Sequence, residues 1–196
     1  MKRNLIILIC LLLASLSPIM AGDDTSATLT LRFTAPSTSS DSVLIGFTSK
    51  DISTMKDSLM SRGGNIKDGL KAAFADLTAF SLTEETTKDD VKGYFSYYST
   101  TPSAYTINVS AQPLASAENA KANSYTINYV LTIGDKTYDT ASTTSTPISF
   151  TITAGGSEAN PKYGSYAVSF GPDSEALANA PKDDYTGKIS VSLSLN

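Results

Sequence analysis

Apolar and polar residues alternate with a period of two at both ends of this chain. Between residues 27 and 35 (ATLTLRFTA) every second residue is apolar, with threonine and arginine between them. From Lys188 to the last residue the same alternation returns, with serine in the polar positions. Successive side chains of a strand point to opposite faces of a sheet, so this pattern predicts strands with one buried face.

Further short segments of the same kind follow one another between turn residues, which gives about eight or nine strands. Two hairpins are predicted, one joining residues 91–99 to 105–114 through TTPSA and one turning at Gly134-Asp135. The remaining predicted strands cover residues 42–47, 146–154 and 164–170. Antiparallel strands at this spacing favour an all-β fold, a two-sheet immunoglobulin-like β-sandwich, over a parallel α/β sheet.

Residues 50–80 interrupt the strand pattern. Their apolar residues recur at helical spacing, and Ser49 or Asp51 can cap a helix that Gly63-Gly64 can end. A second run of helical spacing follows, weakened by Gly69. We predict a short helical insertion of one or two helices in a single β-sandwich domain spanning residues 22–196, with a further helical turn within residues 173–184.

The first 21 residues have the three parts of a secretory signal peptide. Lys2 and Arg3 precede an apolar run, and Pro18 and Ala21 precede the polar sequence GDD. The sequence therefore predicts an exported protein, located in the periplasm, at the cell surface or in the medium. Cys10, the single cysteine, lies in this segment, and no later segment is apolar for long enough to span a membrane.

Composition limits the chemistry that the remaining chain can perform. Removal of Lys2 and Arg3 lowers the Lys+Arg count from 15 to 13 against 19 Asp+Glu, a formal net charge of −6. The lysines are scattered, which argues against nucleic-acid binding. Without histidine or cysteine, the chain has no Ser–His or Cys–His nucleophile and no zinc ligands of the usual kind.

Paired acids remain, such as Asp89-Asp90 and Asp183-Asp184, but adjacency in sequence does not make two carboxylates face each other across a cleft. They are interpreted as solvated loop residues. We therefore predict no enzyme activity, no catalytic residues, no metal site and no cofactor.

The tyrosine-rich stretch at residues 93–99 (GYFSYYS) could supply rings to a ligand. Alternation places Tyr94 and Tyr98 on one face of a strand, and Tyr97 on the other. A tyrosine ring suits both the edge of a core and a sugar platform. Packing is the simpler interpretation, and ligand-facing roles for Tyr94, Tyr97 and Tyr98 are the alternative.

The two terminal strands must each bury an apolar face and pair a backbone edge. They can pair with each other within one molecule, or the first strand of one molecule can complete the sheet of the next. The residues that would make these contacts are the apolar positions of both strands: Leu29, Leu31, Phe33, Ile189, Val191, Leu193 and Leu195.

The tail YTGKISVSLSLN resembles the end of bacterial chaperone–usher pilin subunits, in which a Tyr/Gly-containing turn leads into an alternating final strand. The threonine-rich first strand is similar to the donor strand of those pilins, and the lack of a disulfide resembles their colonisation-factor class. The resemblance implies an incomplete immunoglobulin-like sandwich that is completed by a neighbour. Residues 27–35 would then donate, and residues 187–196 would border the acceptor groove.

Two functions are expected from these features. The first is a non-enzymatic structural or surface protein, of fimbrial type, that self-associates or joins other surface subunits by strand exchange. The second is a self-contained secreted immunoglobulin-like module that recognises a glycan or a host protein.

Overall fold

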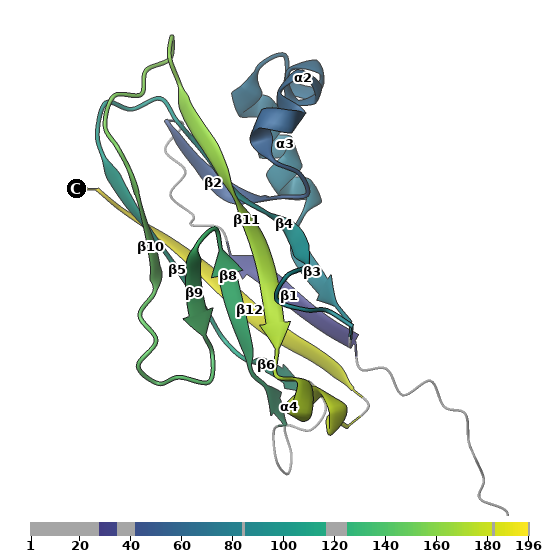
Figure 1. Cartoon of the computed structure of the whole chain (residues 1–196). Helices are drawn as coiled ribbons and strands as arrows, with labels where there is room; N and C mark the ends of the chain where they lie inside the picture. The colour runs from purple at the N-terminus through teal and green to yellow at the C-terminus, as the bar shows by residue number, and fades with distance from the viewer. Residues whose placement is uncertain (1–27, 35–41, 84, 117–124, 182, 196) are drawn as a thin grey trace, which may run out of the picture.

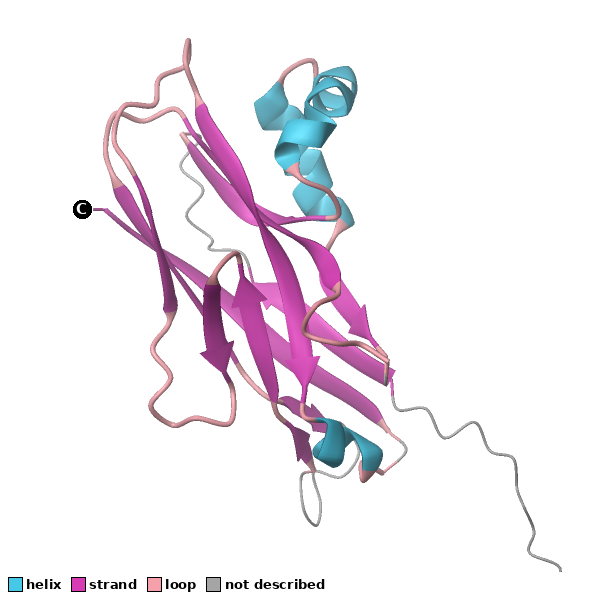
Figure 2. Ribbon diagram, in the orientation of Figure 1, coloured by secondary structure: helices cyan, strands magenta, loops and turns pink. Residues whose placement is uncertain are grey.

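The computed structural model describes residues 28–34, 42–83, 85–116, 125–181 and 183–195. Two β-sheets face each other, and a pair of helices lies against the outer surface of one of them (Figures 1 and 2). The fold is therefore mostly β and sandwich-like, as predicted. The predicted signal peptide at residues 1–21, with Cys10, lies outside the described residues.

The first sheet, here called the terminal sheet, contains both terminal strands. Its main path has the order β10-β5-β12-β1-β3, and β6 and β7 extend it beside β12. Their bounds are β1 Thr28–Thr34, β3 Ala79–Leu82, β5 Tyr105–Ala111, β6 Leu114–Ser116, β7 Thr126–Ile127, β10 Ile148–Ile152 and β12 Asp184–Leu195.

The second sheet, here called the helix-covered sheet, has the order β2-β4-β11-β8-β9. Its strands are β2 Val43–Thr48, β4 Val91–Ser99, β8 Tyr129–Ile133, β9 Lys136–Asp139 and β11 Lys162–Pro172. The turn at Gly134-Asp135 joins β8 to β9 as an antiparallel pair, which confirms that predicted hairpin. Gly134 has a φ of 63°, a backbone conformation that glycine adopts without strain.

The main core lies between the two sheets. Phenylalanines from both sheets meet there, and Phe95 stacks on Phe150 with 5.8 Å between the ring centroids. Phe80 likewise contacts Phe47 and Phe170. Aromatic rings bury large apolar areas, so these contacts join the sheets without a disulfide.

The helical insertion forms a second, smaller core on the outside of the helix-covered sheet. It consists of α2 Ile52–Gly63 and α3 Ile66–Asp76, and a third short helix, α4 Ser174–Ala178, precedes β12. Asp51 caps α2 by accepting a hydrogen bond from Ser53 N at 2.7 Å, and Gly64 ends it in the left-handed conformation at φ 72°. Both ends agree with the predicted caps.

Gly69 explains how the two helices pack so closely. A β-carbon at this position would lie 2.2 Å from the carbonyl oxygen of Leu59 on α2. The glycine that weakens the helical pattern is therefore required by helix packing. Phe74 of α3 rests in the same way over Gly46 of β2, where a β-carbon would lie 2.7 Å from the ring.

Two predictions about the connections are wrong. The strands β4 and β5 do not form a hairpin, because they belong to different sheets and residues 100–104 carry the chain from one sheet to the other. The helical insertion predicted for residues 50–80 also extends too far, because its last residues belong to strand β3. The helix ends at Asp76, and residues 79–82 instead pair with β1 and bury Phe80 in the main core.

Candidate functional site

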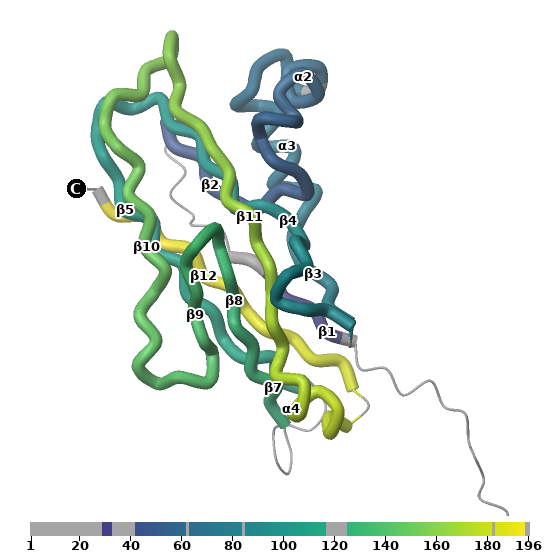
Figure 3. Tube along the Cα trace, viewed as in Figure 1, coloured from purple at the N-terminus to yellow at the C-terminus, as the bar shows by residue number. Residues whose placement is uncertain are grey.

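The two ends of the chain lie side by side in the terminal sheet. Strand β1 runs parallel to β12, from Thr28 opposite Asp184 to Thr34 opposite Ser190, and its other edge pairs antiparallel with β3. Figures 1 and 3 show this contact between the purple start of the described chain and its yellow end. Thus β1 pairs within its own chain, in the interior of the sheet.

The predicted strand-exchange residues divide into two groups. Leu29, Leu31 and Ile189 are completely buried in the main core. Beyond Ser190, where the pairing with β1 ends, Val191 is still buried whereas Leu193 is partly exposed. The side chains of Phe33 and Leu195 lie outside the described residues. Within this chain, β1 therefore pairs with residues 184–190 of β12.

Gly187 makes a packing contact that the alternating pattern did not identify. It is the register partner of Leu31, and a β-carbon at residue 187 would lie 2.7 Å from Leu31 Cδ2. The space that the missing side chain leaves on β12 is therefore occupied by the leucine of β1. Its position in the tail YTGKISVSLSLN was visible in the sequence, but its partner was not.

Tyr185 and Gly187 of the tail are residues of β12 itself. Tyr185 is completely buried, and its hydroxyl donates to the Pro181 carbonyl oxygen at 2.8 Å. Burial, followed by the charge of Asp183 and by Tyr125, raises the pKa of Tyr185. This tyrosine anchors the beginning of β12.

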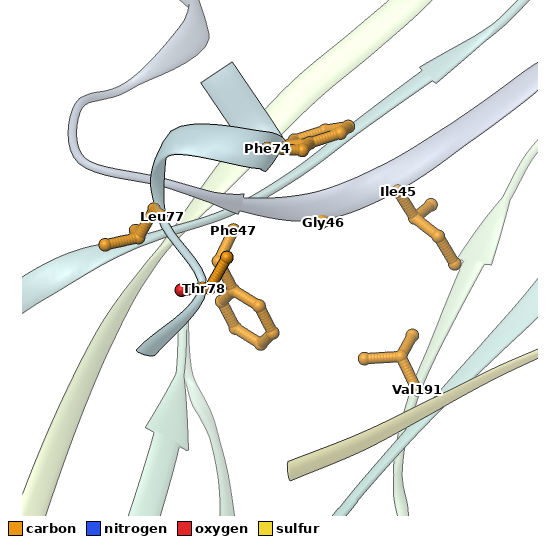
Figure 4. Close-up of a pocket in the computed structure, with 7 residues that line it drawn as sticks. All are labelled: Ile45, Gly46, Phe47, Phe74, Leu77, Thr78 and Val191. Carbon is orange, nitrogen blue, oxygen red and sulfur yellow. The ribbon is translucent and has the colours of Figure 1, made fainter. Parts of the chain in front are cut away.

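An apolar cavity of about 140 Å³ opens where β12 passes the end of β1. Figure 4 shows Val191 of β12 on one side and Ile45, Gly46 and Phe47 of β2 on the other. Phe74 of α3, together with Leu77 and Thr78 of the connection from α3 to β3, completes the lining. The cavity thus lies between the two sheets, beside the half of β12 that extends beyond β1.

The three tyrosines proposed to face a ligand occupy different environments. Tyr97 points into the main core and stacks on Tyr166, with 6.3 Å between the ring centroids. Tyr98 points the other way, into the small core beneath the helices, and only 6% of its surface is exposed. Tyr94, on the same face as Tyr98, is half-buried. The structure does not bring the three rings together into one platform.

Tyr98 nevertheless lines a second, polar pocket of about 480 Å³. The other lining residues are Asn65, Lys67, Asp68 and Lys71 from the beginning of α3, and Glu158 from the loop between β10 and β11. Burial raises the pKa of Tyr98, and the nearby charges of Glu158 and Asp68 raise it further. The phenol therefore remains protonated at neutral pH and can both donate and accept a hydrogen bond.

Both walls of this polar pocket are held by hydrogen bonds. On the helix side, Asn65 Oδ1 accepts from Asp68 N at 2.8 Å while Asn65 Nδ2 donates to Asp68 Oδ2 at 2.8 Å. On the loop side, Gly156 N donates to Thr101 O at 3.0 Å, and Ser157 and Asn160 close a turn around Glu158. Sequence analysis missed this site, because nothing in the sequence connects Glu158 with a helix some ninety residues earlier.

The described residues contain no group of three His, Cys, Asp or Glu side chains that could hold a metal ion. Within the same described ranges, none of the helices has the length and apolar character needed to cross a membrane. The loop acid Asp173 is used structurally, since its side chain accepts hydrogen bonds from Glu175 N and Ala176 N at the start of α4.

No protein-family model, curated protein or solved structure matches this chain.

Proposed function

We propose that this protein is a non-enzymatic, exported structural subunit that assembles at the cell surface by exchanging strand β1 between copies. In this proposal the fold is an immunoglobulin-like sandwich, and the protein works in the manner of the chaperone–usher pilins that its two terminal strands resemble. Strand β1 of one copy takes the place that β1 occupies in the next copy.

The position of β1 is the observation that supports the proposal. It is an interior strand, hydrogen-bonded to β12 on one edge and to β3 on the other. It is also the first strand of the described chain, ahead of β2. An interior strand of this kind can be replaced by the same strand of a second copy, as in domain swapping.

The energetics favour replacement of β1 over simple loss. Leu29 and Leu31 are both completely buried, and emptying a leucine site in a core costs about 2–5 kcal/mol. Departure of β1 would also unpair the facing edges of β12 and β3. An identical strand from a second copy restores each of these contacts, as in domain swapping. Exchange therefore changes the connectivity while it preserves the interactions.

A disulfide trap can test the exchange directly. Arg32 and Lys188 are register partners on β1 and β12, and both side chains are exposed. The double substitution Arg32→Cys/Lys188→Cys, in a Cys10→Ser background, places two thiols on neighbouring strands at a separation that a disulfide can bridge. After oxidation, exchange gives a ladder of covalent multimers on a non-reducing gel, and the ladder collapses on reduction.

The matched control is Arg32→Cys/Ser192→Cys, which moves the second thiol to an exposed residue that is not a partner of residue 32. It should give little specific cross-linking. If the Arg32→Cys/Lys188→Cys protein forms only an intrachain disulfide and stays monomeric at high protein concentration, strand exchange and the subunit role are both contradicted.

A further inference from the structure

We infer that the polar pocket formed by α3, β4 and the β10–β11 loop binds a saccharide, with Tyr98 at its base and Glu158 and Asp68 on opposite walls. This site is separate from β1, and the inference does not depend on strand exchange. Figure 1 shows the helix pair and the β10–β11 loop at the same end of the molecule.

The size and the fixed walls of the pocket indicate a binding site. Its volume of about 480 Å³ falls within the range of about 300–1,000 Å³ that is usual for small-molecule sites. The Glu158 loop is held to the connection after β4 through Gly156 N, and Lys162 Nζ donates to Thr153 Oγ1 at 3.0 Å beside it. A ligand would therefore meet walls that are already in place.

The base of the pocket is formed by a tyrosine whose ring is buried. The ring of Tyr98 packs against the small core, with Leu44 and Leu70 among its members. Tyr98 also lines the pocket, and the charges of Glu158 and Asp68 beside it help to raise the pKa of its hydroxyl. A protonated phenol can donate a hydrogen bond to a ligand and accept one from it.

The formal charges around the pocket cancel, so a ligand without net charge is compatible with it. Two ammonium groups, of Lys67 and Lys71, and two carboxylates, of Asp68 and Glu158, give a formal sum of zero. Sugar hydroxyls both donate and accept, so a saccharide can hydrogen-bond to the exposed Glu158 carboxylate and to the Tyr98 hydroxyl.

The test uses the purified full-length protein and a panel of free glucose, galactose, mannose and N-acetylglucosamine, monitored by saturation-transfer NMR and titration calorimetry. At least one sugar should bind. We expect Tyr98→Phe to weaken binding by about fivefold to tenfold, because it removes one hydrogen bond and keeps the ring. Glu158→Gln should weaken binding by about tenfold or more, because hydrogen bonds to a charged group are stronger.

Two matched controls should bind as the unsubstituted protein does. Tyr163→Phe removes a hydroxyl from a neighbouring strand position that packs on the same small core but does not line the pocket. Glu175→Gln neutralises an exposed acid on α4. If Tyr98→Phe does not fold, Glu158→Gln remains informative, since Glu158 is on an exposed turn.

The same sugars, immobilised as terminal units of oligosaccharides, separate a free sugar from a surface glycan as the natural source. Binding in either form, reduced by the pocket variants alone, supports the inference. If no sugar binds in either form, or if Tyr98→Phe and Glu158→Gln bind as tightly as the controls, the saccharide site is refuted.

Discussion

Leu31 of the first strand packs against Gly187 of the last strand and fills the space that a side chain at residue 187 would need. The two residues are register partners in the parallel β1–β12 pair, and Leu31 is completely buried. Parallel neighbours require a long connection between them, and here the rest of the described domain is that connection. The contact therefore joins the two ends of the fold.

The first prediction concerns this contact. Gly187→Ala should lower the free energy of unfolding by about 1–3 kcal/mol, because a β-carbon 2.7 Å from Leu31 Cδ2 overpacks the site. Urea unfolding measures this change. The same substitution in a Leu31→Ala background should cost much less, because the clashing methyl group is gone. Equal costs in the two backgrounds would show that the residues are not coupled.

The second prediction concerns a chain of hydroxyl groups beneath α2. Ser96 Oγ lies 2.8 Å from Thr48 Oγ1 and 2.9 Å from Ser165 Oγ, which in turn accepts from Ile52 N at 2.9 Å. Ser96→Ala breaks this chain at a completely buried position, so it should destabilise the protein by about 1–3 kcal/mol. Because the chain ends at the first residue of α2, we also expect faster amide exchange in the helix pair.

Ser192→Ala is the control for this prediction, since Ser192 is exposed on β12 and surface substitutions usually change stability by less than about 0.5 kcal/mol. Stability that is the same in the Ser96→Ala and Ser192→Ala proteins would mean that the hydroxyl chain contributes nothing to docking of the helices.

Local signals in the sequence predicted those elements that local physics determines. Alternation in residues 27–35 predicted β1, Asp51 and Gly64 marked the ends of α2, and Gly134 marked the β8–β9 turn. Each depends on side-chain period, a capping hydrogen bond or a positive φ, which a few neighbouring residues specify.

The failures depend on distant partners. Residues 79–82 continue a helical pattern, but pairing with β1 and burial of Phe80 make them strand β3. Residues 100–104 could close a hairpin or cross between sheets, and only the packing of β4 and β5 in opposite sheets decides. The polar pocket likewise joins α3 to Glu158 through tertiary structure alone, so residue pattern could propose Tyr98 but not its neighbours.

The third prediction concerns Tyr129, a tyrosine of β8 that is 1% exposed. Its hydroxyl is buried and has no hydrogen-bond partner among the described residues. Burying an unpaired hydroxyl costs free energy, so Tyr129→Phe should leave the stability at pH 7 unchanged or raise it by about 1 kcal/mol. Tyr185→Phe is the contrast, because it removes a hydroxyl that donates to Pro181 O, and it should be destabilising. A large loss of stability in Tyr129→Phe would reveal a partner for that hydroxyl.

The last prediction concerns alkaline pH. Burial, and secondarily Tyr138, raises the pKa of Tyr129 above the ordinary value for tyrosine. Above pH about 10 the unfolded chain releases this proton while the folded chain retains it, so folding stability falls as the pH rises. The contribution of Tyr129 is therefore fully present below pH about 10, and above it decreases by about 1.4 kcal/mol per pH unit.

Urea unfolding of the unsubstituted protein and of Tyr129→Phe at a series of pH values from neutral to strongly alkaline measures this effect. The stability of Tyr129→Phe should decline less steeply above pH about 10, because one titrating group with a raised pKa has been removed. Tyr97 and Tyr185, whose pKa values burial also raises, should sustain the rest of the decline. Parallel pH profiles for the two proteins would show that Tyr129 ionises as readily in the folded chain as in the unfolded chain, and that its hydroxyl reaches water or an acceptor in the folded state.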